Sequence, residues 1–307
     1  MEFGLHLPDA GAYATRDAML AYATTAEEVG FASLWSSDHI AWPDPDRLAS
    51  QYPYAADNSA FPAPNSPWLE CISSLLFVAA VTDRVKLGTS VLILGYRPAI
   101  QQAKSWATLD HLSGGRAILG AGVGWMKEEF EAIGMPWDRR GERADEFLEV
   151  FEKLWSQEQV SHEGPFLQFG PVGFSPKPPR GRIPVWVGGH TEAAYRRTAR
   201  YGDAFHAAFA TPERLAEEWA GVQAACAEAG RDVAEVELTL LLTAQFLGES
   251  DRPGVIWGSS AHMIDQLATY HELGVTHTVV FPVARGGLEG RLEAVRRFAD
   301  EVIPAFS

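Results

Sequence analysis

Apolar and polar positions along this chain form a strand-then-helix pattern that repeats. Short runs that are apolar on both faces are followed by segments with helical spacing, and we find eight such pairs. The predicted strands are Phe3–Leu7, Ser33–Ser36, Val85–Ile93, Ala117–Ala121, Val185–Val187, Ala204–Phe209, Val236–Phe246 and Thr276–Phe281. Strands that are buried on both faces are typical of a parallel sheet covered by helices.

Each predicted strand is followed by a predicted helix with recognisable ends. The helices are Asp17–Val29, Leu69–Val81, Pro98–Leu112, Glu142–Trp155, Thr191–Arg200, Pro212–Ala229, Ala261–Leu273 and Leu292–Ile303. Several end at a glycine, and one begins with a proline, as helix-end chemistry favours. Eight such units in 307 residues predict an α/β fold, a (β/α)8 TIM barrel forming one domain over residues 1–307. A doubly wound sheet is the alternative.

Two connections are longer than ordinary turns between strands and helices. Residues 41–68 follow the second strand, at the end of the barrel where such enzymes hold ligands, so they are a candidate lid. A packed or disordered loop is the alternative interpretation. The aromatic residues of this loop are Trp42, Tyr52, Tyr54, Phe61 and Trp68. They suggest an apolar or aromatic substrate. The second connection, residues 157–182, contains a possible hairpin over residues 160–169.

Composition narrows the class of protein. The formal charge is −15 and basic residues form no dense block, so we expect neither nucleic acid nor an anionic membrane as a partner. We see no apolar run long enough to span a membrane and no signal peptide, and a cytoplasmic location is the simplest expectation. Cys71 and Cys226 are expected to be free buried thiols.

Glycine clusters follow two of the predicted strands. Gly120, Gly122 and Gly124 end the fourth strand, where bare backbone lets a flat or bulky group approach closely. Gly188 and Gly189 lead from the fifth strand into a helix start, whose free N–H groups suit a phosphate. A tight barrel corner and an ordinary capped turn are the alternatives. The first cluster lacks the third glycine of the dinucleotide fingerprint.

The segment LWSSDHI places polar side chains where the second strand ends. Ser37, Asp38 and His39 are expected at the same rim as the glycines. A histidine there can bind a ligand or carry a proton near neutral pH. A structural histidine tied to nearby backbone is the alternative.

These rim segments together resemble a known family. SSDH, LGTSVLILGYRPAIQQAKSWATLDHLSGGRAILGAGVGW, EEFEAIGMPWDRRGERADEFLEVFEKLW and PVWVGGHTEAAYRRTARYGDAF are similar to the bacterial-luciferase-like superfamily. Within it they resemble the branch of oxidoreductases that depend on the deazaflavin coenzyme F420. The resemblance implies a TIM barrel that holds a flavin-type ring at its rim. It covers nearly the whole chain.

The resemblance also implies roles for particular residues. A cis peptide bond between Ser90 and Val91 would form a bulge against the ring, and His39 would contact the ring or the substrate. Asp38 would take part in cofactor binding. The residues beside the ribityl chain would be Gly122, Val123 and Gly124. Those around the phosphate would be Gly188, Gly189, His190 and Thr191. The family's habit further implies a homodimer, a small-molecule substrate and a separate reductase or dehydrogenase that recycles the cofactor.

The sequence departs from the best-understood deazaflavin dehydrogenases at one position. Trp125 follows the fourth-strand glycines where some of them have an acidic residue, and the nearest acids are Glu128 and Glu129. This departure favours a closed, aromatic substrate site over a sugar-phosphate or alcohol dehydrogenase that needs the acid. The anionic tail of the coenzyme would need basic residues near the rim. The candidates are Arg139 and Arg140, with Arg47 behind them; a solvated charge run is the alternative.

Four functions remain open from the sequence. The first is hydride transfer with F420, and the second is a two-component monooxygenase that uses reduced FMN. The third is a flavin-binding protein without turnover. The fourth is a metal-dependent hydrolase with ligands such as His190 and His206, although the usual metal motifs are absent and we expect no metal.

Overall fold

The computed structural model describes residues 1–43, 48–53 and 66–307. The expectations for Arg47, Tyr54 and Phe61 fall outside these residues. Among the helices within the described ranges, none combines the length and the apolar character needed to cross a membrane.

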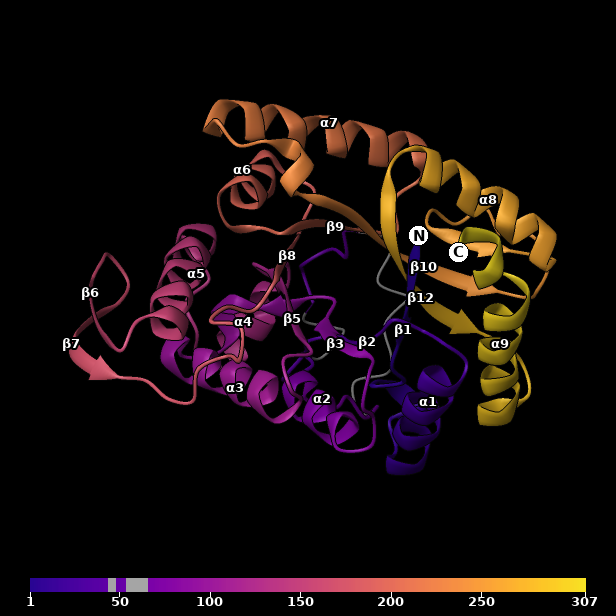
Figure 1. Ribbon diagram of the computed structural model, residues 1–307, viewed down its shortest axis with the longest axis horizontal. Helices are drawn as coiled ribbons and strands as arrows, with labels where there is room; N and C mark the ends of the chain where they lie inside the picture. The colour runs from indigo at the N-terminus through magenta and orange to yellow at the C-terminus, as the bar shows by residue number, and fades with distance from the viewer. Residues whose placement is uncertain (44–47, 54–65) are drawn as a thin grey trace.

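Parallel strands form a closed barrel at the centre of the molecule (Figure 1). The barrel strands are β1 (Glu2–His6), β2 (Ser33–Ser36), β3 (Lys86–Thr89), β5 (Ala117–Gly122), β8 (Val185–Gly188), β9 (Ala204–Ala208), β10 (Glu237–Gln245) and β12 (Val275–Val283). Each pairs in parallel with its neighbours, and the pairing of β9 with β10 closes the ring. The predicted TIM barrel is therefore confirmed.

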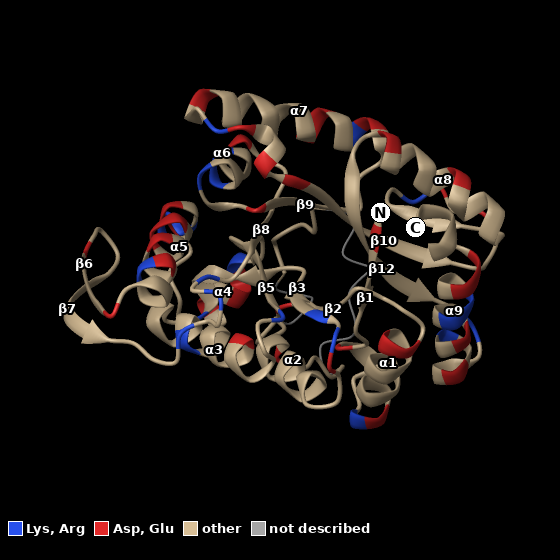
Figure 2. Cartoon of the chain, viewed as in Figure 1, with Lys and Arg blue, Asp and Glu red and all other residues tan. Residues whose placement is uncertain are grey.

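Helices surround the barrel, as the repeated pattern predicts (Figure 1). They are α1 (Arg16–Glu28), α2 (Cys71–Ala79), α3 (Ala99–Leu112), α4 (Lys127–Ala132), α5 (Arg140–Ser156), α6 (Glu192–Tyr201), α7 (Pro212–Ala229), α8 (Ser260–Glu272) and α9 (Gly287–Glu301). In Figure 2 the residues coloured as charged lie mainly on these helices and in loops, while the strands are largely tan. This separation follows from burial of the strands on both faces.

Large aromatic side chains fill the interior of the barrel. Trp35 is fully buried, and its ring centroid lies 4.7 Å from that of Trp186 and 5.4 Å from that of His206. Glycines at positions 4 and 88 make room for it, because a Cβ at either position would overlap an atom of the Trp35 ring. The two glycines, on the strands on either side of β2, thus leave room for the Trp35 indole in the barrel core.

The boundaries differ from the predictions at a few places. The third strand is interrupted, because β3 ends at Thr89, a cis peptide bond joins Ser90 to Val91, and the chain resumes as β4 (Leu92–Ile93). The short helix α4 was not predicted, and neither was the short strand β11 (Val255–Trp257). Both are too short to show a clear period.

The predicted hairpin is confirmed in the second long connection. Strands β6 (Gln159–Glu163) and β7 (Gln168–Gly173) pair antiparallel. Figure 1 shows them outside the ring of helices, beyond α5. Glu146 on α5 holds the turn, because its carboxylate accepts hydrogen bonds from the backbone N–H groups of Phe166 and Leu167.

Candidate active site at the carboxyl end of the barrel

Half-buried residues gather where the strands end. They are Ser37, Ser90, Val91, Val123, Gly188, Ala208, Thr243 and Phe281. Most are small, and the bulky Trp35 and Trp186 lie deeper in the barrel, where they are buried. We call the set of half-buried residues the mouth. Because carboxyl ends of barrel strands carry the active sites of such enzymes, the mouth is the candidate site.

The cis bond between Ser90 and Val91 places the Val91 side chain across two neighbouring strands. A Cβ at Gly122 would lie 2.5 Å from Val91 Cγ2, and one at Gly188 would lie 2.9 Å from Val91 Cγ1. A Cβ at Gly120 would overlap the carbonyl oxygen of Thr89. The backbone of Thr89 therefore excludes a side chain at position 120, and the Val91 side chain disfavours one at positions 122 and 188. The sequence did not identify this contact with Val91, and the predicted place of Gly122 and Gly188 beside a cofactor stays a prediction.

Two serine hydroxyl groups at the mouth are hydrogen-bonded to buried histidines. Ser90 Oγ lies 2.8 Å from Nε2 of His206, and Ser37 Oγ lies 2.7 Å from Nε2 of His6. The other ring nitrogen of His6, Nδ1, lies 2.8 Å from the carbonyl oxygen of Leu7. Because a carbonyl oxygen only accepts, His6 Nδ1 carries a proton; with the ring neutral, Nε2 then accepts the proton of Ser37.

His206, like His6, is hydrogen-bonded through both of its ring nitrogens. Its Nδ1 lies 2.9 Å from Thr239 Oγ1, and that hydroxyl donates to the carbonyl oxygen of Phe205. Burial first, and then the nearby His277 and His6, lower the pKa of His206 to about 3. His206 is therefore neutral at pH 7, and Ser90 donates its proton inward and presents oxygen lone pairs to the mouth.

His39 lies among tryptophan rings. Its ring centroid is 4.8 Å from that of Trp42, 4.5 Å from that of Trp68 and 6.5 Å from that of Trp125, all edge-on. Trp42 and Trp68 stack on each other with 5.4 Å between centroids. We call these four residues the aromatic pocket. The two ends of the candidate lid therefore meet at His39, which is 13% exposed.

Glu129 contacts His39 from the short helix α4. Its Oε2 lies 2.7 Å from His39 Nδ1 and accepts a hydrogen bond of 2.7 Å from the hydroxyl of Tyr96. Its Oε1 accepts from the backbone N–H groups of Ile40 and Ala41. The neighbouring Glu128 accepts from the N–H groups of Ala49 and Ser50. Two adjacent carboxylates thus fix the start of the loop to α4.

Asp38 is buried and holds other parts of the chain. Both its oxygens accept from the guanidinium of Arg97 at 2.8 Å, and Oδ2 also accepts from the backbone N–H of Ile93. Its side chain is fully buried. These contacts fix the segment that follows β4, and the predicted contact of Asp38 with a cofactor stays a prediction.

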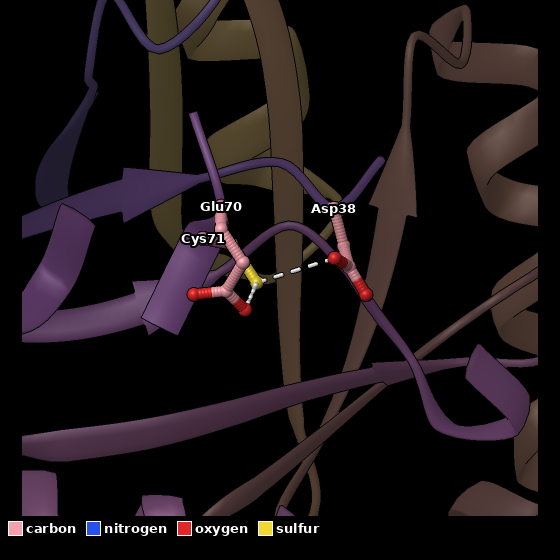
Figure 3. A group of neighbouring side chains, drawn as sticks. All are labelled: Asp38, Glu70 and Cys71. Carbon is pink, nitrogen blue, oxygen red and sulfur yellow. Dashed lines mark hydrogen bonds between the residues drawn. The ribbon is translucent and has the colours of Figure 1, made fainter. Parts of the chain in front are cut away.

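Asp38, Glu70 and Cys71 form the one group of three potential metal ligands found in the described part of the chain (Figure 3). The cation between the two carboxylates is Arg97, which also pairs with Glu70 at 2.7 Å. Burial, and next the charge of Asp38, raise the pKa of the Cys71 thiol well above its usual value, so it stays protonated. A protonated thiol beside a guanidinium does not favour a metal ion. His190 and His206 belong to no such group, so the metal-site alternative has no support among these residues.

The predicted phosphate residues lie where β8 leads into α6. Gly189 has φ of +128°, a conformation that glycine adopts readily, and Thr191 caps the helix by accepting from Ala194 N–H. The N–H groups of Glu192 and Ala193 precede the first hydrogen bond of the helix, and this position suits an anion. Desolvation, and then the charge of Arg214, lower the pKa of His190.

Of the two predicted rim arginines, Arg140 is closer to the glycine segment. Its Nε donates to the carbonyl oxygen of Gly124 at 3.1 Å, and its guanidinium stacks on Trp137. Arg139 is instead exposed and pairs with Glu142. Arg140 therefore brings positive charge next to residues 122–124.

The comparisons with known proteins agree with this fold. A family model described as luciferase-like monooxygenase matches residues 1–252, so the chain belongs to that family. The chain is 33% identical over 266 residues to an uncharacterized protein of Mycobacterium tuberculosis, covering 84% of this chain and 85% of the other. It is 35% identical over 128 residues to an FMNH(2)-dependent dimethylsulfone monooxygenase of Pseudomonas putida, covering 40% of this chain and 35% of that protein.

A solved structure gives the same architecture. An F420-dependent secondary alcohol dehydrogenase in complex with an F420–acetone adduct superposes with a TM-score of 0.81. The match covers 100% of this chain and 99% of that one at 18% identity, which establishes a shared fold.

Proposed function

We propose that this luciferase-like protein is an oxidoreductase that binds coenzyme F420 at the mouth and transfers hydride to or from a small apolar or aromatic molecule. The observation that carries the proposal is that the Ser90–Val91 bulge and the His39 segment lie side by side. The N–H of Ser90 donates to the carbonyl oxygen of Ser36 at 2.9 Å, three residues before His39. A ring resting on the bulge would then face the aromatic pocket.

The residues at the mouth fit a planar ring with an anionic tail. The small half-buried residues Ser37, Ser90 and Val123 leave the backbone approachable, and Ser90 offers a hydrogen-bond acceptor. The N–H groups of Glu192 and Ala193 at the start of α6 would bind the phosphate, next to Thr191. Arg140 would add positive charge beside the tail. The coenzyme, when bound, supplies the two-electron hydride chemistry.

The chain's own residues would handle water and the proton. Trp42, Trp68 and Trp125 surround His39 and would exclude water from the reacting atoms. His39 would exchange a proton with the oxygen of the substrate, within reach of the same pocket. A homodimer, and a separate enzyme that recycles the coenzyme, complete the proposal.

A second candidate is a monooxygenase that uses reduced FMN. The similarity to the dimethylsulfone monooxygenase favours it, because that relative is FMNH(2)-dependent. The two candidates differ in reaction class, since a deazaflavin carries carbon at ring position 5 and does not form the oxygen adduct that a flavin forms.

Parallel titrations of the purified protein with oxidised F420 and with FMN test the proposal. We expect tighter binding of F420, followed by loss of its fluorescence or by calorimetry. A Ser90→Ala variant should weaken binding, whereas Gly170→Ala on the outer hairpin should not. Preference for FMN would replace our proposal with the monooxygenase.

A further inference from the structure

We propose that Glu129 is a positioning residue that fixes the proton of His39 on Nδ1 and leaves Nε2 free to accept a proton from the substrate. This inference rests on the proposed function for the chemistry at Nε2. The position of the ring proton itself follows from contacts within the protein and can be measured separately.

Glu129 occupies a site built for a carboxylate anion. Its side chain is 0% exposed, and the two oxygens receive the four hydrogen bonds described above, from His39, Tyr96, Ile40 and Ala41. Burial alone would raise its pKa, but the bonds and charge of His39, followed by the other donors, outweigh it and the pKa is lowered. Glu129 is therefore ionised and can only accept.

The direction of the bond to His39 follows from that ionisation. An acceptor-only carboxylate 2.7 Å from Nδ1 requires the proton of a neutral imidazole to be on Nδ1. Nε2 then carries a lone pair. Because Ile40 and Ala41 are bonded to the same carboxylate, the backbone that follows His39 is fixed together with its ring.

The free Nε2 suits one direction of proton transfer. When a substrate alcohol loses hydride from carbon to the deazaflavin, its O–H bond breaks and the proton forms a new N–H bond at Nε2. The substrate becomes a carbonyl compound, and the resulting imidazolium lies beside an anion, which stabilises it. In the reverse direction the imidazolium returns the proton to the carbonyl oxygen.

The contact between Glu129 and His39 also bears on the substrate class. Trp125 at the position of an acid disfavours an alcohol dehydrogenase that needs an acid there. In the structure the carboxylate of Glu129, four residues after Trp125, contacts His39. An acidic partner is therefore present, and secondary alcohols with apolar or aromatic substituents belong to the substrate class that we propose.

The adjacent glutamates give a matched pair of variants. Both lie on α4 and both accept from backbone N–H groups of the loop, but only Glu129 touches His39. The first measurement is the nitrogen-15 chemical shifts of His39 in the full chain, assigned by difference from His39→Gln. We expect wild type and Glu128→Gln to show protonated Nδ1 and unprotonated Nε2. In Glu129→Gln the proton should move partly to Nε2, because an amide can also donate.

The second measurement is turnover of 1-phenylethanol with oxidised F420. We expect Glu129→Gln to lower kcat roughly 100-fold or more, within the range of acid–base effects, and Glu129→Asp to recover part of it. A wild-type His39 protonated on Nε2, or an unchanged ring in a folded Glu129→Gln, would overturn the inference whatever the cofactor. Failure to bind F420 would instead overturn the proposed function, while leaving the nitrogen measurement valid.

Discussion

The contact between Val91 and the bare strands predicts how one methyl group at Gly122 would act. In Gly122→Ala the new Cβ would lie 2.5 Å from Val91 Cγ2, closer than such atoms can approach. Either the Val91 side chain or the β5 backbone must shift. We therefore expect a loss of stability whose size depends on Val91.

The magnitude follows from packing. Inserting a methyl group into a close-packed site costs about 1–3 kcal/mol. Removing the two γ-methyl groups of the half-buried Val91 costs about 1–1.5 kcal/mol. If the two effects were independent, the double variant would lose roughly 2–4.5 kcal/mol. Because Val91→Ala removes the atom that the new methyl group would meet, the double variant should be close to Val91→Ala alone.

Thermal unfolding of four proteins measures this coupling: wild type, each single variant and the double variant. At roughly 2–4 °C per kcal/mol, Gly122→Ala should lower Tm by about 2–12 °C. Gly170→Ala is the control, because a Cβ added there would have no atom within 4 Å, and its Tm should stay near wild type. Strictly additive shifts would refute the reasoning, since they would show that Val91 is not what excludes a side chain at Gly122.

Burial and exposure lead to two more predictions. His206 is buried, and its pKa is lowered from 6.5 to about 3. Between these two pH values the unfolded chain binds a proton at His206 and the folded chain does not. The free energy of unfolding should therefore fall below pH 6.5 by roughly 1.4 kcal/mol per pH unit, down to pH 3. In His206→Asn this contribution should vanish, which acid titration of unfolding would show as a shallower slope; an unchanged slope would contradict it. Leu112 at the end of α3 is 70% exposed, and Phe77 and Val81 on or just after the adjacent α2 are 38% and 40% exposed. We expect the exposed Leu112 to lie in the contact between two copies, so Leu112→Glu should convert a dimer to a monomer in light scattering; a persistent dimer would exclude Leu112 from the contact.

Periodicity predicted the fold because the barrel is built from local patterns. Strands such as Ala117–Gly122 are apolar on both faces, and helices such as Pro212–Ala229 begin and end with standard capping residues. The errors lie at the ends of elements, in the interruption of the third strand and in short segments such as α4, whose six residues span less than two turns. A segment that short has no period to detect.

The site was harder to predict because its partners are distant along the chain. Glu129 is 90 positions from His39, and His206 is 116 positions from Ser90. No local pattern marks such pairs. The cis bond at Ser90–Val91 followed from the family resemblance and is present. The resemblance did not reveal the contacts of Asp38 with Arg97 and Ile93, and its predicted role in cofactor binding stays a prediction.

The two glutamates of α4 divide the loop after β2 into parts with different freedom to evolve. Glu129 holds residues 40 and 41, and Glu128 holds residues 49 and 50. Insertions between Ser50 and Trp68, or substitutions there that spare Trp68, would therefore keep the bonds between Glu129 and the His39 segment. Related chains could therefore acquire new substrate preferences through changes after residue 50 while His39 and its contact with Glu129 are kept.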